Sequence, residues 1–281
     1  MNNQPYCFMA CNSDYQDASV VIFGAPYDGT VSYRPGTRFA PSAIRNESFG
    51  IETYSPYLRK DLEDIKVFDA GDLEFGFGNS RKVLDEIRDM TAKIINDNKI
   101  PVMLGGEHLV TLGCIEAMIS KFPDLRILHF DAHADLREEY LGEELSHACV
   151  LRRCHELTGD NRIFQFGIRS MTREEDKFAE KHIIQVKYNL EGIDDAIEKL
   201  KGKPVYVTID LDVLDPSCFS GTGTPEPGGL FFKELMGAVH KLKDLTVVGG
   251  DINELAPHYD QSGASTVTAC KILREFLLTI K

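Results

Sequence analysis

The sequence has no tryptophan, no Cys-x-x-Cys pair and no long apolar run. Its seven cysteines are irregularly spaced, so neither a zinc ribbon nor a disulfide framework is indicated, and reduced thiols are expected. A membrane-spanning helix needs about 20 apolar residues, so none is predicted. The N-terminus lacks a basic region followed by an apolar run, so no secretory signal is expected. These absences together predict a soluble, cytoplasmic protein.

Positive charge is also scarce. The 31 lysines and arginines face 44 aspartates and glutamates, which gives a net charge of −13 and an isoelectric point of about 5.1. Because phosphate groups are bound by basic patches, nucleic acid and anionic membranes are not expected as partners. The acidic balance weakly favours small cationic ligands, although it also serves solubility. A hydrophobic content of 43% is sufficient for a buried core.

No linker-like stretch, repeat or low-complexity tract divides the 281 residues, so one domain over 1–281 is predicted, with 1–18 as an N-terminal arm on the surface. Apolar runs predict strands at 20–24, 65–69, 101–105, 126–131, 162–167, 183–186, 204–211 and 245–250. Helical spacing predicts helices at 79–98, 107–122, 172–181, 190–201, 230–242 and 262–278. The alternation predicts an α/β fold, a three-layer αβα sandwich with a mostly parallel eight-stranded sheet.

Acidic and imidazole side chains follow four of these strands. The run at 126–131 leads into Asp131, His133 and Asp135, which share one side of an extended chain because side chains alternate with period two. His108 follows the run at 101–105, Asp210 and Asp212 follow the apolar residues at 205–209, and Asp251 and Glu254 follow the run at 245–250. Ligands of parallel sheets bind beyond the carboxyl ends of the strands, so this edge is predicted to carry the functional site.

The candidate ligands are four carboxylates and two imidazoles: His108, Asp131, His133, Asp135, Asp210 and Asp212. Taken singly, a structural histidine or capping aspartates would explain them. Together they are too many for one catalytic zinc ion and suit two ions that share bridging carboxylates. Oxygen-rich ligation favours Mn²⁺ or Mg²⁺, and the imidazoles shift the balance towards Mn²⁺, Fe, Ni or Zn. Such a centre makes hydroxide available near neutral pH and predicts a hydrolase.

Several motifs in order carry a family resemblance: Gly-Gly-Glu-His at 105–108, Asp-Ala-His-Ala-Asp at 131–135, Ser-His at 146–147 and Thr-Ile-Asp-Leu-Asp-Val-Leu-Asp-Pro at 208–216. From about residue 20 to the C-terminus the chain resembles the ureohydrolase (arginase/agmatinase) family. The resemblance implies an arginase-like fold, a binuclear centre of two Mn²⁺ ions, a homo-oligomer (trimer or hexamer) and hydrolysis of a guanidino compound to urea and an amine.

The resemblance also implies roles for individual residues. One manganese would be held by His108, Asp131, Asp135 and Asp210, and the other by His133, Asp131, Asp210 and Asp212. His147 matches a histidine that passes protons to the leaving amine, and Glu254 matches a glutamate that receives the guanidinium. A solvent-facing loop histidine and a surface glutamate are the alternatives for these two. The segment 33–45 also resembles the family. A substrate loop is one alternative there, but a structural loop over the rim of the sheet or a subunit contact is expected.

The substrate is suggested by the loop at 136–146. Its four glutamates, at 138, 139, 143 and 144, outnumber Arg137 and should disfavour an anionic tail. The expected substrate is therefore agmatine, converted to putrescine and urea for polyamine biosynthesis; glutamates that simply face water are the counter-interpretation. Guanidinobutyrase, guanidinase or arginase activity is the alternative, and a non-catalytic binding or scaffold protein is a more remote one. Leu109, Ala148 and Ser220 depart from the commonest family pattern and put loop shape in question.

Overall fold

The computed structural model describes residues 7–281 and contains one eight-stranded sheet in which every neighbouring pair is parallel. Its order is β4-β1-β5-β10-β9-β6-β7-β8. The strands are β1 (Val20–Ala25), β4 (Val67–Asp72), β5 (Ile100–Gly105), β6 (Arg126–Phe130), β7 (Ile163–Ile168), β8 (Ile184–Lys187), β9 (Pro204–Asp210) and β10 (Thr246–Asn253). A separate antiparallel pair joins β2 (Tyr54–Ser55) to β3 (Lys60–Asp61). The predicted three-layer α/β fold is confirmed.

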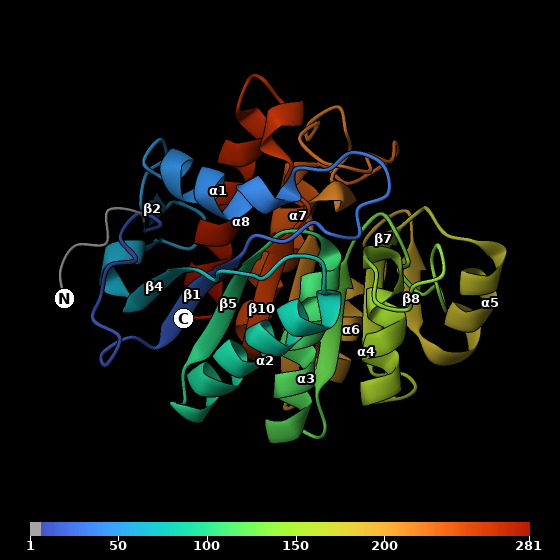
Figure 1. Ribbon diagram of the computed structural model, residues 1–281. Coiled ribbons are helices and arrows are strands. Elements are labelled where there is room, and N and C mark those ends of the chain that lie inside the picture. The colour runs from blue at the N-terminus through green and yellow to red at the C-terminus, as the bar shows by residue number, and fades with distance from the viewer. Residues whose placement is uncertain (1–6) are drawn as a thin grey trace.

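Alternate residues of each strand enter different cores because both faces of the sheet are covered. Val20 and Ile22 of β1 face one core, and Val21 and Phe23 face the other. Helices α2 (Ser80–Asn96), α3 (Thr111–Lys121), α4 (Val150–Thr158) and α5 (Arg173–His182) close the second core; α1 (Ala40–Ser48), α6 (Ile193–Leu200), α7 (Phe232–Val239) and α8 (Ala264–Thr279) close the first. Figure 1 shows α2, α3 and α4 in front of the sheet, with α1 and α8 on its other side. Within residues 7–281, no helix is long and apolar enough to cross a membrane.

The helices α1 and α4 were not predicted. In α1 the buried apolar residues are only Ala40, Pro41 and Ile44. So few apolar residues do not give a clear helical spacing in the sequence, and the segment resembles a loop. The segment 33–45, expected to be a loop, therefore ends inside a helix. In α4 the buried positions Val150, Leu151 and Cys154 give a helical stripe, but the helix spans only nine residues directly after an acidic loop.

The N-terminal arm is more deeply packed than its polar composition predicts. Residues 1–6 of the expected arm lie outside the described residues. Phe8, Met9 and Cys11 are buried in the core, and Asn12 forms an antiparallel bridge with Phe68 of the edge strand β4. The described part of the arm therefore covers one edge of the sheet, which would otherwise expose unpaired backbone groups.

Arg45 of α1 forms a buried ion pair with that same edge strand. Its Nε and Nη2 atoms each lie 2.9 Å from an oxygen of Asp69, a bidentate arrangement, and Nη1 contacts Asp72. Asp69 also accepts a hydrogen bond from the Phe8 backbone, 2.8 Å long. The guanidinium thus joins α1, β4 and the arm through a single buried carboxylate.

Arg45→Ala should lower the free energy of unfolding by about 3–5 kcal/mol, because it leaves the Asp69 carboxylate buried without a partner charge. Chemical denaturation followed by circular dichroism measures this loss. Lys201→Ala is the control, since it removes an exposed pair with Glu198 and should leave the unfolding midpoint unchanged. Equal midpoints for the two variants would show that the buried pair contributes nothing specific.

Candidate metal centre and substrate cavity

The four strands that the candidate residues follow are neighbours in the sheet. β5, β10, β9 and β6 lie side by side in this order, so their carboxyl ends form one continuous edge. His108 follows β5, Asp131 follows β6, Asp210 ends β9 and Glu254 follows β10. The predicted residues are therefore brought together at the centre of the sheet.

Glycine at position 106 allows the loop after β5 to pass close to the loop after β1. A Cβ atom there would lie 2.0 Å from the carbonyl oxygen of Tyr27, a distance that no side chain tolerates. The backbone of Glu107 donates to that same carbonyl at 2.8 Å, and the Glu254 amide donates to the Gly106 carbonyl at 3.0 Å. These bonds bring His108 and Glu254 next to each other at the sheet edge.

Three carboxylates converge on one nitrogen of His108. Its Nδ1 atom lies 3.0 Å from Asp131 Oδ2, 3.1 Å from Asp135 Oδ2 and 3.4 Å from Asp210 Oδ2. Nδ1 is buried and makes no hydrogen bond of acceptable geometry, whereas Nε2 lies 2.9 Å from the hydroxyl of Thr208. An imidazole nitrogen and three oxygens around one point are a donor set that suits a divalent cation.

A second group lies beside the first and shares one residue with it. His133 Nδ1 lies 3.0 Å from Asp212 Oδ2 and 3.5 Å from Asp131 Oδ1. Asp131 therefore presents Oδ2 towards His108 and Oδ1 towards His133. Backbone bonds hold this geometry, since Asp131 Oδ1 accepts from the His133 amide at 2.6 Å and Asp210 Oδ1 accepts from the Asp212 amide at 2.8 Å.

The clustered carboxylates concentrate negative charge, which favours the binding of a positive charge. Burial, followed by the charges of Asp212 and Asp131, raises the pKa of Asp210 well above its usual range. Burial acts to lower the pKa of His108, but the nearby carboxylates of Asp131, Asp135 and Asp210 outweigh this and hold the pKa well above its usual value. The donor set and its excess of negative charge therefore fit the binding of divalent cations.

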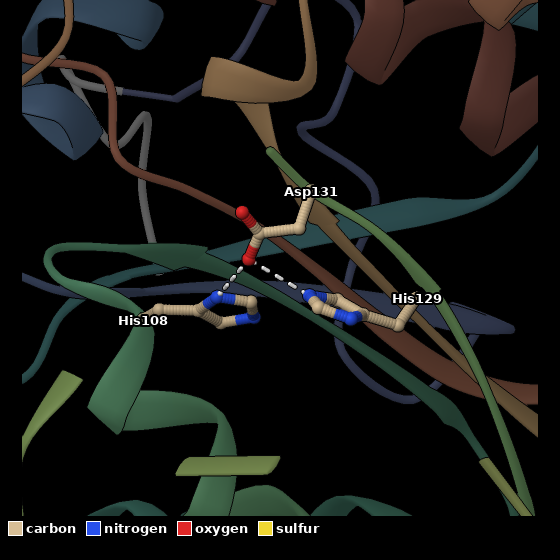
Figure 2. A group of neighbouring side chains, drawn as sticks. All are labelled: His108, His129 and Asp131. Atoms are coloured by element: carbon tan, nitrogen blue, oxygen red, sulfur yellow. Dashed lines mark hydrogen bonds and ion pairs between the residues drawn. The ribbon is translucent and has the colours of Figure 1, made fainter. Parts of the chain in front are cut away.

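His129 belongs to this cluster and was not predicted. It lies on β6, and its Nε2 donates to Asp131 Oδ2 at 2.8 Å, so that both His108 and His129 point at one carboxylate (Figure 2). Its Nδ1 accepts from Gln165 Nε2 at 3.0 Å, and burial lowers its pKa, so the ring stays neutral with a fixed proton. The period-two spacing of positions 129, 131 and 133 is the signal that could have found it.

His129→Ala should weaken metal binding at the cluster by about 10- to 100-fold, because Asp131 would lose the donor that orients it. Titration of the metal-free protein with Mn²⁺ measures the affinity directly. Gln185→Ala serves as a control, since Gln185 contacts only the far end of the same hydrogen-bonded chain, through Gln165. If His129→Ala binds Mn²⁺ with the wild-type affinity, His129 only packs in the core and does not orient Asp131.

Glu254 and His147 line a cavity of about 240 Å³ together with the candidate metal ligands His133, Asp135 and Asp210. Glu254 has a left-handed backbone (φ 65°), and its Oε1 accepts from the His108 amide at 2.7 Å. Burial, and next the charge of Glu107, raises the pKa of Glu254 well above its usual range. Such a carboxylate binds a cation strongly, because the cation offsets both effects.

His147 is held by the loop after β1 rather than facing solvent. Its backbone amide donates to Thr30 Oγ1 at 3.0 Å, and its Nδ1 lies 3.3 Å from the same oxygen. Thr30 Oγ1 in turn lies 2.6 Å from Glu107 Oε1. Burial, and next the charge of His133, lowers the pKa of His147 to about 4. The ring is therefore neutral at pH 7.

The acidic loop does not line the cavity in the way the sequence suggested. All four glutamates, at 138, 139, 143 and 144, are exposed, and none is among the residues of 7–281 that line the cavity. The members of this loop that line the cavity are Arg137 and Tyr140, together with Glu175 of α5. The cavity lining gives no support to the expectation that these glutamates select the substrate, and the alternative that they face water describes the structure.

The fold and the cluster define a class of protein, an α/β protein with candidate metal-binding groups at the carboxyl edge of a parallel sheet. A model of the arginase family matches residues 18–279. The chain is 47% identical over 275 residues to an agmatinase of Bacillus subtilis (strain 168), covering 96% of this chain and 95% of that protein. It is 39% identical over 266 residues to the N(1)-aminopropylagmatine ureohydrolase of Thermococcus kodakarensis, covering 92% and 89%.

A solved structure gives the same result. The agmatine ureohydrolase of Thermoplasma volcanium is 34% identical, with a TM-score of 0.89, over 100% of this chain and 95% of that chain. The chain described here belongs to the arginase family.

Proposed function

We propose that this chain hydrolyses agmatine to putrescine and urea. The observation that carries the proposal is that one cavity is lined both by Glu254 and by three members of the metal-ligand cluster, His133, Asp135 and Asp210. The raised pKa of Glu254 shows that a bound cation would stabilise its charged form. The cavity thus joins a place for a guanidinium group to a place for divalent cations. Relatives named as agmatinases at 47% and 46% identity, over 96% of the chain, support agmatine as the guanidino compound.

We assign two Mn²⁺ ions to the cluster. His108, Asp131, Asp135 and Asp210 would hold one, and His133, Asp131, Asp210 and Asp212 would hold the other. The different oxygens that Asp131 presents to His108 and His133 support its role as the bridging residue. When bound, the pair of ions would supply the Lewis acidity that makes hydroxide available near neutral pH.

Glu254 would bind the guanidinium and fix the position of its central carbon. A carboxylate can accept two parallel N–H bonds from this planar cation, which sets its orientation as well as its place. Glu254 is itself fixed by the bond from the His108 amide. The hydrogen bond between the His108 amide and Glu254 therefore fixes the position of the substrate carbon relative to the metal ligand His108.

His147 would carry a proton to the leaving amine. Because its lowered pKa keeps the ring neutral in the free site, it would first take a proton released at the centre and then donate it. Its bonds to Thr30 fix the ring at the cavity wall, where both steps can occur.

The tail of the substrate would meet Arg137, Tyr140 and Glu175. Glu175 is already engaged, because its Oε1 accepts from the Leu136 amide at 2.9 Å and its Oε2 accepts from the Thr172 amide at 2.7 Å. The Arg137 side chain lies 4.5 Å above the ring of Tyr140. The Thermococcus kodakarensis relative makes N(1)-aminopropylagmatine the second candidate substrate, distinguished from agmatine by a longer cationic tail.

A substrate panel tests the proposed function. Manganese-loaded protein should release urea from agmatine with the highest kcat/KM, and more slowly from N(1)-aminopropylagmatine, guanidinobutyrate, guanidine and arginine. If kcat/KM is higher for one of these compounds than for agmatine, that compound is the substrate instead. Release of no urea from the whole panel by fully loaded protein would favour a non-catalytic binding or scaffold role.

We further propose that the chain forms one domain, acts in the cytoplasm in polyamine biosynthesis, and assembles as a homo-oligomer, a trimer or hexamer. The single continuous sheet supports the first of these. Light scattering of the purified protein measures the assembly state.

A further inference from the structure

A second group of side chains that could hold a metal ion lies outside the cavity, where α4 and α5 end. His155 Nε2 lies 2.8 Å from Asp160 Oδ1, and His182 Nδ1 lies 2.7 Å from the same oxygen. One ligand atom from each residue lies within 4.8 Å of the other two. None of the three lines the cavity that contains Glu254. The group is therefore separate from the proposed manganese centre.

The backbone fixes these three residues relative to one another. His155 lies in the last turn of α4, and His182 is the last residue of α5. Asp160 lies between Gly159 and Asn161, both of which have a left-handed backbone. The Gly159 amide donates to the His155 carbonyl at 2.7 Å, and the Asn161 amide donates to the His182 carbonyl at 2.8 Å. The turn that carries the carboxylate is thus bonded to both residues that carry the imidazoles.

The two imidazole rings are also held by aromatic packing. The ring of Phe178 meets His155 edge-on at a centroid distance of 5.0 Å and lies 4.5 Å from the ring of His182. The guanidinium of Arg152 covers Phe178 at 3.8 Å. Since packing restricts the ring orientations, both nitrogens stay directed at Asp160 and little side-chain freedom would be lost on binding an ion.

The chemistry of the group favours a particular class of ion. Two imidazole nitrogens with one carboxylate oxygen suit Zn²⁺, Ni²⁺ or Cu²⁺, whereas Mg²⁺ and Ca²⁺ prefer oxygen ligands alone. The bonds from His155 and His182 lower the pKa of Asp160, so its carboxylate is ionised at neutral pH. The side chains of His155, Asp160 and His182 are 15%, 57% and 32% exposed, which gives an ion access and leaves room for water as a further ligand.

We propose that His155, Asp160 and His182 form a second metal site that binds a divalent transition ion such as Zn²⁺. The ion would bind the ring nitrogens now directed at Asp160, each neutral ring keeping its proton on its other nitrogen, and would link the end of α4 to the end of α5. These two helices begin at the cavity wall, because α4 follows His147 and the first turn of α5 contains Glu175. A bound ion would therefore hold α4 and α5 in fixed relative positions, and these helices begin beside residues that line the cavity.

Zinc titration of the manganese-loaded protein tests the proposal. Calorimetry with elemental analysis should show one zinc ion per chain taken up without release of manganese. His155→Gln and His182→Gln should each lose this ion, whereas His258→Gln, which removes an exposed histidine elsewhere, should keep it. Zinc should raise the melting temperature of the wild type and of His258→Gln by a few degrees, but not that of the two site variants.

Three outcomes would overturn the site: no zinc uptake beyond exchange with manganese, uptake that persists in His182→Gln, or uptake that the His258 control also loses. The melting temperatures without zinc show whether each variant is folded. Asp160→Asn keeps the size and the turn while removing the charge, so it should lose zinc even if a histidine variant misfolds. Because the readout is zinc binding, the result is independent of whether agmatine is the substrate.

Discussion

Asp131→Ala should lose both ions of the proposed manganese centre and lower turnover by more than about 100-fold. Mutating a residue that hydrogen-bonds to a metal ligand lowers metal affinity or activity by about 10- to 100-fold. Removing a carboxylate that is itself shared by two ions should have a larger effect. Asp131 Oδ2 lies 3.0 Å from His108 Nδ1, and Asp131 Oδ1 lies 3.5 Å from His133 Nδ1, so its removal affects both groups. Elemental analysis after gel filtration and urea release from agmatine measure the two effects.

Asp212→Ala is the matched control for this result. Asp212 Oδ2 lies 3.0 Å from His133 Nδ1, within the second group, and has no comparable contact with His108 among the ion pairs of residues 7–281. This variant should keep one ion per chain, whereas the Asp131 variant should keep none. Two ions retained in Asp131→Ala would disprove the bridging assignment without affecting the substrate assignment.

The sequence predicts the membership of the cluster better than its arrangement. His108, Asp131 and Asp210 were found because polar residues stand directly after buried apolar runs, and parallel strands present such residues at one edge. That β5, β10, β9 and β6 are neighbours could not be predicted, because strand order depends on how the crossover helices pack. The proposed bridging role of Asp131 depends on that order.

The roles of Arg45 and His129 were not predicted, for different reasons. Arg45 was read as part of a loop because its partner Asp69 is 24 positions away and nothing local marks the pair. His129 was read as an ordinary strand residue, although its donation to Asp131 is local. The glutamates of the 136–146 loop show the opposite error: their charge was visible in the sequence, but the direction in which a loop side chain points is set by tertiary packing.

Glu254→Gln should lower kcat/KM for agmatine by roughly 100-fold, which corresponds to about 3 kcal/mol for a buried, charge-assisted pair. The glutamine oxygen can still accept from the His108 amide, so the loop after β10 and the content of both ions should be unchanged. The lost charge removes the attraction for the guanidinium, and KM should rise while kcat falls. Steady-state urea release on fully manganese-loaded protein measures both parameters.

Glu138→Gln distinguishes this specific role from a general loss of negative charge around the cavity. Glu138 follows Arg137, which lines the cavity, but it is itself exposed and is not among the lining residues. Its variant should therefore change kcat/KM far less than the Glu254 variant does. A higher KM with unchanged kcat in Glu254→Gln would mean that the guanidinium is held equally in the ground and transition states. A fall in kcat as well is expected if Glu254 also aligns the carbon for attack, since misalignment costs rate after binding is complete.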